Sequence, residues 1–397
     1  MKKIMFAMYS MGLGGVEKAL IELLKELAKV DDWDITLLLL ERRGEFLEQV
    51  PQKVHIKVCD IPSHILLENT LDTKNALKTA LQSGNIKAFI RIVRDYMRHR
   101  NMTPQQVLQD NWETWDSEIC PESDAYDIAV DFQGMGVFTT FYVAKYVKAP
   151  VKLTWIHNDI SVIQESMEWQ KPVYDHFNRV FCVSKEAERQ TIGKLPFVEG
   201  KTGLFYNIIP KEDILLAAKV QEQKLSGTMK ILTVGRLSYP KGYDIAIPVM
   251  KKLIQKGYDI DYYIVGEGEQ RAELENLIER LGISDRIHLL GYQSNPYQYI
   301  AQCDIYFQPS RFEGFCITLG EAKILHKPIV TTDFAGAREQ IINNENGLII
   351  PCEEKAMFET LAQIIKDTGL QKEFSKRLID ENKMHSDVDL LKEFIVK

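Results

Sequence analysis

The sequence predicts an α/β protein built from two doubly wound domains. Hydrophobic runs that read as buried strands alternate with segments whose apolar residues recur at helical spacing, as at 4–9 and 16–28. The same alternation starts again near residue 230, after a polar stretch. At 397 residues the chain is too long for one ordinary hydrophobic core, so two domains are expected. In such domains ligands bind at the carboxyl ends of the strands.

The composition is normal for a soluble globular protein. Apolar residues make up 45% and charged residues 26%, and the net charge of −7 does not suggest nucleic-acid binding through overall charge. The six cysteines are scattered without a Cys-x-x-Cys pair, which disfavours a zinc site or a disulfide framework and suits a reducing cytoplasm. The N-terminal apolar run is short and breaks into glycines, so a first strand is expected rather than a signal peptide. No stretch is long enough to span a bilayer.

A glycine loop follows the first strand. The strand at 4–9 leads into the loop at 10–15, and the helix at 16–28 comes next. Backbone N–H groups at such a helix start can bind a phosphate. The loop is not the dinucleotide fingerprint, because Glu17 stands where the third glycine is required. Glycine turns between strand and helix also occur for steric reasons alone.

Strands are then expected at 35–40 and 54–58, followed by a polar helical region at 71–112. Its charges are segregated: residues 74–100 contain seven Lys or Arg and one acid, whereas 101–144 contain eight acids and no Lys or Arg.

The basic part of this region predicts an amphipathic helix. Its apolar face carries Ile86, Phe89, Ile90, Val93 and Met97, and its opposite face carries Arg91, Arg94 and Arg98. Such a helix can lie on an anionic membrane or bind a lipid-linked diphosphate. The favoured expectation is that the apolar face packs on the domain's own sheet and that the arginines are solvated, since amphipathic surface helices are common in globular proteins.

Strands at 127–132, 151–156 and 179–184 complete the first half, and the polar segment 211–229 is interpreted as the interdomain connection. His157 follows the middle strand of these three, where a side chain points into the ligand crevice of an α/β domain. A lone histidine in a sequence is more often structural than catalytic.

The second half repeats the pattern with two cations in its first loop. A strand at 230–234 is followed by Arg236 and Lys241 and by a helix at 243–255. An Arg and a Lys on one strand-to-helix loop can hold a diphosphate from two sides, although two surface cations near a turn would look the same. Strands at 261–265 and 287–290 follow, and Tyr292 comes directly after the second.

A carboxylate stands between the next strand and helix. The strand at 305–307 and the helix at 317–325 flank a loop that contains Glu313, and Glu321 lies on the helix. Backbone N–H groups at the helix start can bind oxygens, and the two acids can accept hydrogen bonds from hydroxyls of a long ligand. The alternative is an ordinary strand–loop–helix unit with two solvated acids.

The segment from Glu313 to Glu321 resembles the Glu-x7-Glu signature of family-four retaining glycosyltransferases. Three further stretches are similar to that family's motifs: Arg236 to Gly242, Gly14 to Glu17, and Gly336 to Glu339, in which Ala335 replaces the expected first glycine. The resemblance implies the GT-B fold, two Rossmann-like domains that face each other across a cleft. The expected domains are an acceptor-side domain at 1–208, a nucleotide-sugar domain at 209–380, and a terminal helix at 381–397 that returns to the first domain.

The resemblance also implies roles for residues. The donor diphosphate would be held by Arg236 and Lys241, the donor sugar by Glu313 and His157, and the ribose by Glu321. Further contacts with the substrates are expected from Gly14, Gly15, Tyr292, Gly314, Phe315, Cys316 and Thr318. The implied reaction moves a hexosyl group with retention from a UDP-sugar to a hydroxyl of a glycan or lipid-linked glycan, as in bacterial capsule and other surface-polysaccharide synthesis. The place of action would be the cytoplasm, or the inner face of the cell membrane.

No cofactor or metal ion is expected. Asp-x-Asp matches occur at 32–34, 259–261 and 387–389, but the first two precede strands and the third lies in a polar segment near the C-terminus. Two alternatives remain open. Sugar-nucleotide 2-epimerases share the fold, and a non-catalytic subunit of this fold would bind a partner enzyme instead of turning over a substrate.

Overall fold

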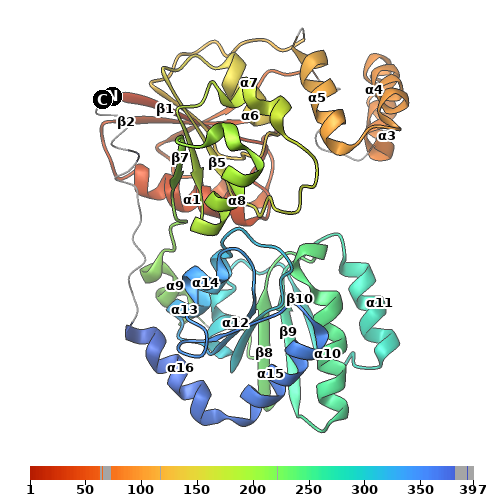
Figure 1. Ribbon diagram of the computed structural model, residues 1–397, viewed down its shortest axis with the longest axis vertical. Helices are drawn as coiled ribbons and strands as arrows, with labels where there is room; N and C mark the ends of the chain where they lie inside the picture. The colour runs from red at the N-terminus through yellow and green to blue at the C-terminus, as the bar shows by residue number, and fades with distance from the viewer. Residues whose placement is uncertain (63–64, 66–72, 117, 221, 381–390, 392–397) are drawn as a thin grey trace. The chain divides into compact units, whose positions relative to one another are not determined.

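The computed structural model describes residues 1–62, 65, 73–116, 118–220, 222–380 and 391. Within these residues the chain forms two parallel β-sheets, each with helices on both sides (Figure 1). The sheets lie in separate compact units. The first unit comprises Met1–Val183 and Glu188–Phe205, and the second comprises Ser184–Ala187 and the described chain from Tyr206 to Asp380. The expected terminal helix at 381–397 falls outside the described residues, apart from Leu391.

The first sheet has the strand order β3-β2-β1-β4-β5-β6-β7. Its strands are β1 (Lys2–Met8), β2 (Trp33–Leu39), β3 (Val54–Val58), β4 (Ile128–Asp131), β5 (Val151–Ile156), β6 (Arg179–Cys182) and β7 (Thr202–Leu204). The accompanying helices are α1 (Gly15–Leu27), α3 (Thr73–Gln82), α4 (Ile86–His99), α5 (Pro104–Trp115), α6 (Phe138–Tyr146), α7 (Lys171–Tyr174) and α8 (Lys185–Lys194). The order reverses between β1 and β4, which is where doubly wound sheets bind ligands.

The second sheet has the order β10-β9-β8-β11-β12-β13. Its strands are β8 (Met229–Val234), β9 (Ile260–Val265), β10 (Ile287–Gly291), β11 (Ile305–Gln308), β12 (Ile329–Thr332) and β13 (Leu348–Ile350). Its helices are α9 (Lys211–Ala217), α10 (Tyr243–Gln255), α11 (Arg271–Leu281), α12 (Tyr297–Gln302), α13 (Ile317–Ile324), α14 (Ala337–Gln340), α15 (Glu354–Lys366) and α16 (Thr368–Asp380). Here the order reverses between β8 and β11, which pair directly.

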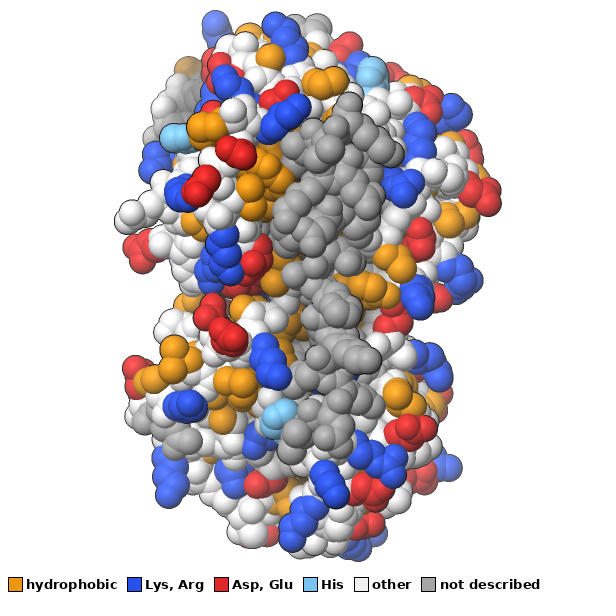
Figure 2. All heavy atoms as spheres, turned by 90° about the vertical axis from the view of Figure 1, so that its left-hand side faces the viewer, with side chains coloured by type: hydrophobic (Ala, Val, Ile, Leu, Met, Phe, Trp, Pro, Cys, Tyr) orange, Lys and Arg blue, Asp and Glu red, His pale blue; other side chains and the backbone are white. Residues whose placement is uncertain are grey.

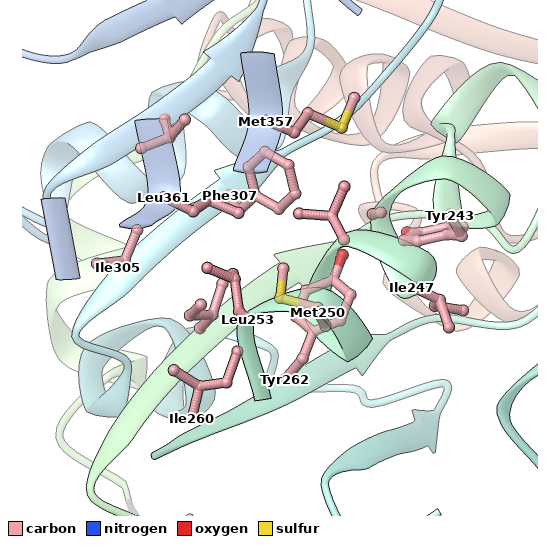
Figure 3. Packing of buried hydrophobic residues seen from close by; sticks show 14 of the residues in the cluster. Tyr243, Ile247, Met250, Leu253, Ile260, Tyr262, Ile305, Phe307, Met357 and Leu361 are labelled. Atoms are coloured by element: carbon pink, nitrogen blue, oxygen red, sulfur yellow. The ribbon is translucent and has the colours of Figure 1, made fainter. Parts of the chain in front are cut away.

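Both faces of the second sheet are apolar because helices cover both, as parallel sheets require. On one face, buried residues of β9 and β11 pack against α10 and α15 (Figure 3). Tyr262 and Phe307 point from the strands toward Met250 and Met357 of these helices. The other face packs against α12, α13 and α14 through a second cluster that includes Tyr306 and Leu319. Two packed layers fix the strand ends, and with them the loops that follow.

The surface carries charged side chains of both signs, as expected from the composition. On the face shown in Figure 2, acidic and basic side chains are interspersed over each unit. None of the helices in the described part of the chain combines the length and the apolarity needed to cross a membrane.

The structure corrects one expectation about the basic helical region. The segment at 71–112 forms α3, α4 and α5, but much of the apolar face of α4 does not pack on the sheet. Ile86, Ile90 and Met97 are 68%, 62% and 64% exposed. The residues that α4 buries are Ala88, Ile92 and Asp95, so its packed face is rotated away from the predicted one.

Candidate active site

The two loops at the reversal point of the second sheet meet through an ion pair. Lys241 ends the short 3-10 helix Tyr239–Lys241 that follows β8, and Glu313 lies in the loop that follows β11. The Lys241 ammonium donates to the Glu313 carboxylate. Because β8 and β11 are neighbours, residues 72 positions apart in the sequence come into contact. The sequence predicted each residue for this edge of the sheet, and the structure brings them together.

Three consecutive side-chain hydrogen bonds also hold Glu313 in place. Ser310 Oγ donates to Glu313 Oε1 at 2.9 Å, Gln308 Nε2 donates to Ser310 Oγ at 2.8 Å, and Tyr306 OH donates to Gln308 Oε1 at 2.9 Å. Gln308 and Ser310 are fully buried. A carboxylate fixed by a cation and a hydroxyl has little freedom, so its remaining lone pairs have a defined direction.

The same pair sets the charge of Lys241. Burial alone would lower the pKa of Lys241, but the Glu313 carboxylate raises it above its ordinary value against the opposing charge of Arg236. Lys241 therefore carries a positive charge at neutral pH. Arg236 is exposed in the loop directly after β8. This end of the sheet thus presents a half-buried cation, an exposed cation and an oriented carboxylate, a set that can bind a diphosphate next to a polyol.

A second clamp, missed in the sequence, joins the two loops. Arg311 donates to both carboxylate oxygens of Asp244 at 2.7 Å, and its guanidinium lies over the ring of Tyr239, 4.2 Å from the centroid. The N–H of Arg311 also donates to the carbonyl of Pro240 at 2.7 Å. In the sequence this contact was indicated only by Arg311, two residues before Glu313, and by Asp244 in the first turn of α10, where the helix dipole favours a carboxylate.

Two glycines permit these loops to approach each other. Gly242 has φ +71°, and a Cβ on it would lie 2.1 Å from the carbonyl oxygen of Pro309. Gly336 lies beside the Glu313 loop, where a Cβ would be 2.6 Å from Phe315 Cα. Gln340 of α14 donates to the Phe315 carbonyl and so holds the same loop.

The remaining predicted residues of this loop lie at the start of α13. Gly314, Phe315 and Cys316 are buried, and Thr318 Oγ1 lies 3.4 Å from Cys316 Sγ. Burial raises the pKa of the Cys316 thiol to about 12, so it is protonated at neutral pH.

Glu321 is completely buried on α13, and the Tyr297 hydroxyl donates to it at 3.4 Å. A ribose can reach this carboxylate only if a neighbouring side chain moves. Tyr292 is exposed after β10, two strands away from β8, at the same edge of the sheet.

The first unit holds the other predicted residues at its own reversal point and one strand beyond it. Gly14 and Gly15 begin α1 directly after the loop that follows β1. His157 follows β5, which pairs with β4. His157 Nε2 lies 2.9 Å from the Phe132 carbonyl oxygen, and because a carbonyl only accepts, Nε2 carries the proton. Burial lowers the pKa of His157 to about 4, so the ring is neutral at pH 7 and Nδ1 is the unprotonated nitrogen.

No group of three or more His, Cys, Asp or Glu side chains gathers as a metal site anywhere in the described residues. Asp259 and Asp261 are engaged by Arg286 and His288 at the start of β9, at the opposite end of the strand from the ion pair. The third Asp-x-Asp match, at 387–389, lies outside the described residues.

The protein-family comparison matches residues 217–381 to "Glycosyl transferases group 1". Among curated proteins, a Campylobacter jejuni N-acetylgalactosamine-N,N'-diacetylbacillosaminyl-diphospho-undecaprenol 4-alpha-N-acetylgalactosaminyltransferase is 34% identical over 45% of this chain and 48% of its own length. The capsular polysaccharide biosynthesis glycosyltransferase CapM of Staphylococcus aureus is 28% identical over 39% of this chain and 42% of its own. The chain therefore covers about half or less of the length of these relatives.

Among solved structures, Anabaena HepE in complex with UDP-glucose superposes with a TM-score of 0.66 at 20% identity, covering 99% of this chain and 98% of that one. At this identity the likeness shows the fold alone, and it confirms the predicted GT-B class of two Rossmann-like domains. The family match contains Arg236, Lys241, Glu313 and Glu321, which belong to motifs that carry the resemblance, whereas the motif from Gly14 to Glu17 lies outside it. Residues 217–381, somewhat less than half of the chain, thus match the glycosyl transferases group 1 family, which the sequence motifs of this part resemble.

Proposed function

We propose that this protein is a retaining glycosyltransferase that moves a hexosyl group from a UDP-sugar to a hydroxyl of a glycan or lipid-linked glycan, without a required metal ion. The observation that carries the proposal is the Lys241–Glu313 pair at the reversal point of the second sheet. The support lies in the chemistry of the pair: an ammonium group can bind a phosphate, the carboxylate in contact with it can accept from sugar hydroxyls, and phosphate and sugar are neighbours in a nucleotide-diphosphate sugar.

The proposed reaction proceeds on one face of the sugar. The bond between the anomeric carbon and the diphosphate oxygen breaks, and the acceptor oxygen bonds to the same face of that carbon. The acceptor proton passes to the leaving diphosphate, which departs as UDP. Lys241 and Arg236 stabilise the charge that develops on the leaving group, work that a metal ion performs in other enzymes. Glu313 orients the sugar. Because His157 is neutral, its Nδ1 can accept a hydrogen bond, but the ring does not serve as a general acid.

The named relatives support the substrate classes. The Campylobacter protein's name contains a diphospho-undecaprenol acceptor, CapM is named for capsular polysaccharide, and HepE was crystallised with UDP-glucose. From these we infer a UDP-sugar donor and an acceptor in bacterial surface-polysaccharide synthesis for the present chain.

The roles of Glu313 and Glu321 can be distinguished by titrating variants with UDP and with UDP-sugars. Binding is measured as a rise in melting temperature, since a bound ligand raises stability by mass action. Glu313→Gln should weaken UDP-sugar binding and turnover by about 10–100-fold, the effect of one hydrogen bond to a charged group, and should weaken UDP binding less. Glu321→Gln should weaken both ligands alike, because the ribose is common to them.

The matched control is Lys252→Gln, which breaks an exposed Lys–Glu pair between α10 and α15 in the same unit. It should leave donor binding unchanged. Equal turnover in Glu313→Gln and the parent would contradict the proposed role of the pair. Formation of UDP-ManNAc from UDP-GlcNAc without acceptor would assign a 2-epimerase instead, and stabilisation by UDP without turnover of any donor would favour a non-catalytic subunit.

A further inference from the structure

Helices α3 and α4 form a hairpin with a small core of its own. Ala76 and Ala80 of α3 are buried against Ala88 and Ile92 of α4, with Leu77 and Phe89 partly buried around them. Figure 1 shows the two helices side by side at the margin of the first unit, next to α5. Because the hairpin buries one face internally, the opposite face of α4 is left for solvent or for a partner.

That opposite face is apolar. Ile86, Ile90 and Met97 are 62–68% exposed and share one side of the helix, since their spacing of four and seven residues is close to whole turns. Leu81 of α3 and Tyr96 of α4 are also more than half exposed. We call Ile86, Ile90 and Met97 the apolar ridge. A group of large exposed apolar side chains marks an interaction site more often than a chance surface.

A groove adjoins the ridge. A cavity of about 870 Å³ is lined by Leu77, Leu81 and Tyr96 together with Lys74 and Lys78. Apolar side chains and two lysines therefore face the same space, as they would toward a ligand with a hydrocarbon part and an anionic part.

The charges around the ridge have one sign. Lys74, Lys78, Lys87, Arg94 and Arg100 are all exposed, and the single acid between residues 73 and 100, Asp95, is buried. This local excess of positive charge contrasts with the net charge of −7 for the chain.

Two of the three arginines predicted on one face of α4 are held in ion pairs within the first unit. Arg91 pairs with Asp95 at 3.0 Å and with Glu118 at 2.6 Å, and Arg98 pairs with Asp95 at 3.0 Å and Asp110 at 2.7 Å. These two arginines therefore attach α4 to α5 and the segment that follows it. The surface that remains for a partner is the apolar ridge with its flanking lysines, not the arginine face.

We propose that the apolar ridge docks on an anionic lipid surface, with Ile86, Ile90 and Met97 inserted at the level of the headgroups and the exposed lysines against lipid phosphates. An apolar stripe bordered by cations is the chemistry that an anionic bilayer recognises, whereas a buried protein interface is depleted in lysine. The inference goes beyond the proposed function, because the hairpin contributes none of the residues assigned to donor binding.

The test is sedimentation of the full chain with phosphatidylcholine vesicles that contain or lack phosphatidylglycerol. The triple variant Ile86→Gln, Ile90→Gln, Met97→Gln keeps good helix formers on an exposed face, so the fold should be retained. It should lower partitioning onto phosphatidylglycerol vesicles by at least about tenfold, since three inserted side chains are lost. The matched control replaces three exposed apolar residues of the second unit, Leu216, Val220 and Ile342, by Gln and should bind like the parent.

A second variant, with Lys74, Lys78, Lys87 and Arg94 replaced by Gln, should lose the dependence of binding on phosphatidylglycerol and on salt, because exposed charge attraction is screened. In the parent, amide exchange within α4 should slow on adding phosphatidylglycerol vesicles and not on adding phosphatidylcholine alone.

Three results would overturn the proposal. The first is a parent that ignores phosphatidylglycerol vesicles at low salt, and the second is a triple variant that binds them as well as the parent. The third is a parent that dimerises through the ridge, seen as a dimer in sedimentation velocity that the triple variant loses, because the ridge would then cover a second copy of this chain.

Discussion

At the scale of single residues, hydrogen bonds to the Lys241–Glu313 pair offset the loss of hydration of its two charges, and the pair can still exchange partners with a ligand. Two charges taken out of water lose hydration, and their attraction repays this only with good geometry and further hydrogen bonds. Ser310 supplies one such bond to Glu313. A ligand phosphate that replaced the carboxylate as the partner of Lys241 would exchange one anion for another, so the pair can open without leaving a bare buried charge.

His157 gives a prediction for stability against pH. Its pKa is lowered to about 4 in the folded protein, below its ordinary value of 6.5. Between these values the unfolded chain binds more protons, so stability is lost as the pH falls from about 6.5 and the loss stops growing below about 4. A shift of this size limits the contribution of His157 to roughly 3 kcal/mol.

Chemical denaturation of the parent and of His157→Gln, measured across this pH range, checks the prediction. The amide of Gln can still donate to the Phe132 carbonyl but does not titrate, so the variant should lose less stability in acid than the parent. The control His55→Gln, at an exposed position of the same unit, is measured in the same way. An NMR titration of His157 with its midpoint near 6.5 would show that the ring is not held neutral.

At this scale the sequence predicted residue types at strand ends but not their contacts. Glu313 and Lys241 were recognised separately because each stands in a motif, whereas their pairing depends on β8 and β11 being neighbours. Arg311 and Asp244 were missed for the same reason, since their bond crosses the two loops. Glu321 was placed on the correct helix, but its complete burial depends on α12, which packs beside it.

At the scale of elements, the turn before α14 controls the position of the Glu313 loop. A Cβ on Gly336 would lie 2.6 Å from Phe315 Cα and 2.8 Å from the Gly314 carbonyl oxygen. Both atoms belong to backbone, so Gly336→Ala must displace the loop or the turn, at a cost of about 1–3 kcal/mol. We expect a lower melting temperature and weaker binding of a UDP-sugar.

The control is Gly193→Ala in α8, where a Cβ meets nothing within 4 Å. It should be neutral or slightly stabilising, because Ala favours a helix more than Gly does. If Gly336→Ala bound the donor like the parent, the turn would not position the loop that carries Glu313.

Element type was predictable where the hydrophobic pattern was strong. The predicted helix at 243–255 and the predicted strands at 54–58 and 151–156 agree with α10, β3 and β5. The short helix α9 was missed because the segment 211–229 is polar and was interpreted only as a connection. The exposed face of α4 was wrongly expected to pack, because periodicity indicates an apolar face and not what covers it.

At the scale of the whole chain, the two units repeat one arrangement. In each sheet the order reverses between the first strand and the fourth, and in each unit the segment between the first strand and its helix contains residues suited to a phosphate. The first unit offers glycines before α1, and the second offers Arg236 and Lys241. The units differ in charge at this place: the second carries the cations and the carboxylate, which makes it the expected site of the nucleotide-sugar.

This division gives the last prediction, on metal ions. If Arg236 and Lys241 neutralise the leaving diphosphate, transfer should need no divalent ion, and turnover should persist in excess EDTA. The measurement is release of UDP from a donor with a soluble acceptor, with and without chelator. NaCl added to the same ionic strength is the matched control, because it removes no metal ion. Loss of turnover in free EDTA alone, restored by Mn²⁺ or Mg²⁺, would mean that the cations of the loop after β8 are not sufficient and that an ion shares the diphosphate with them.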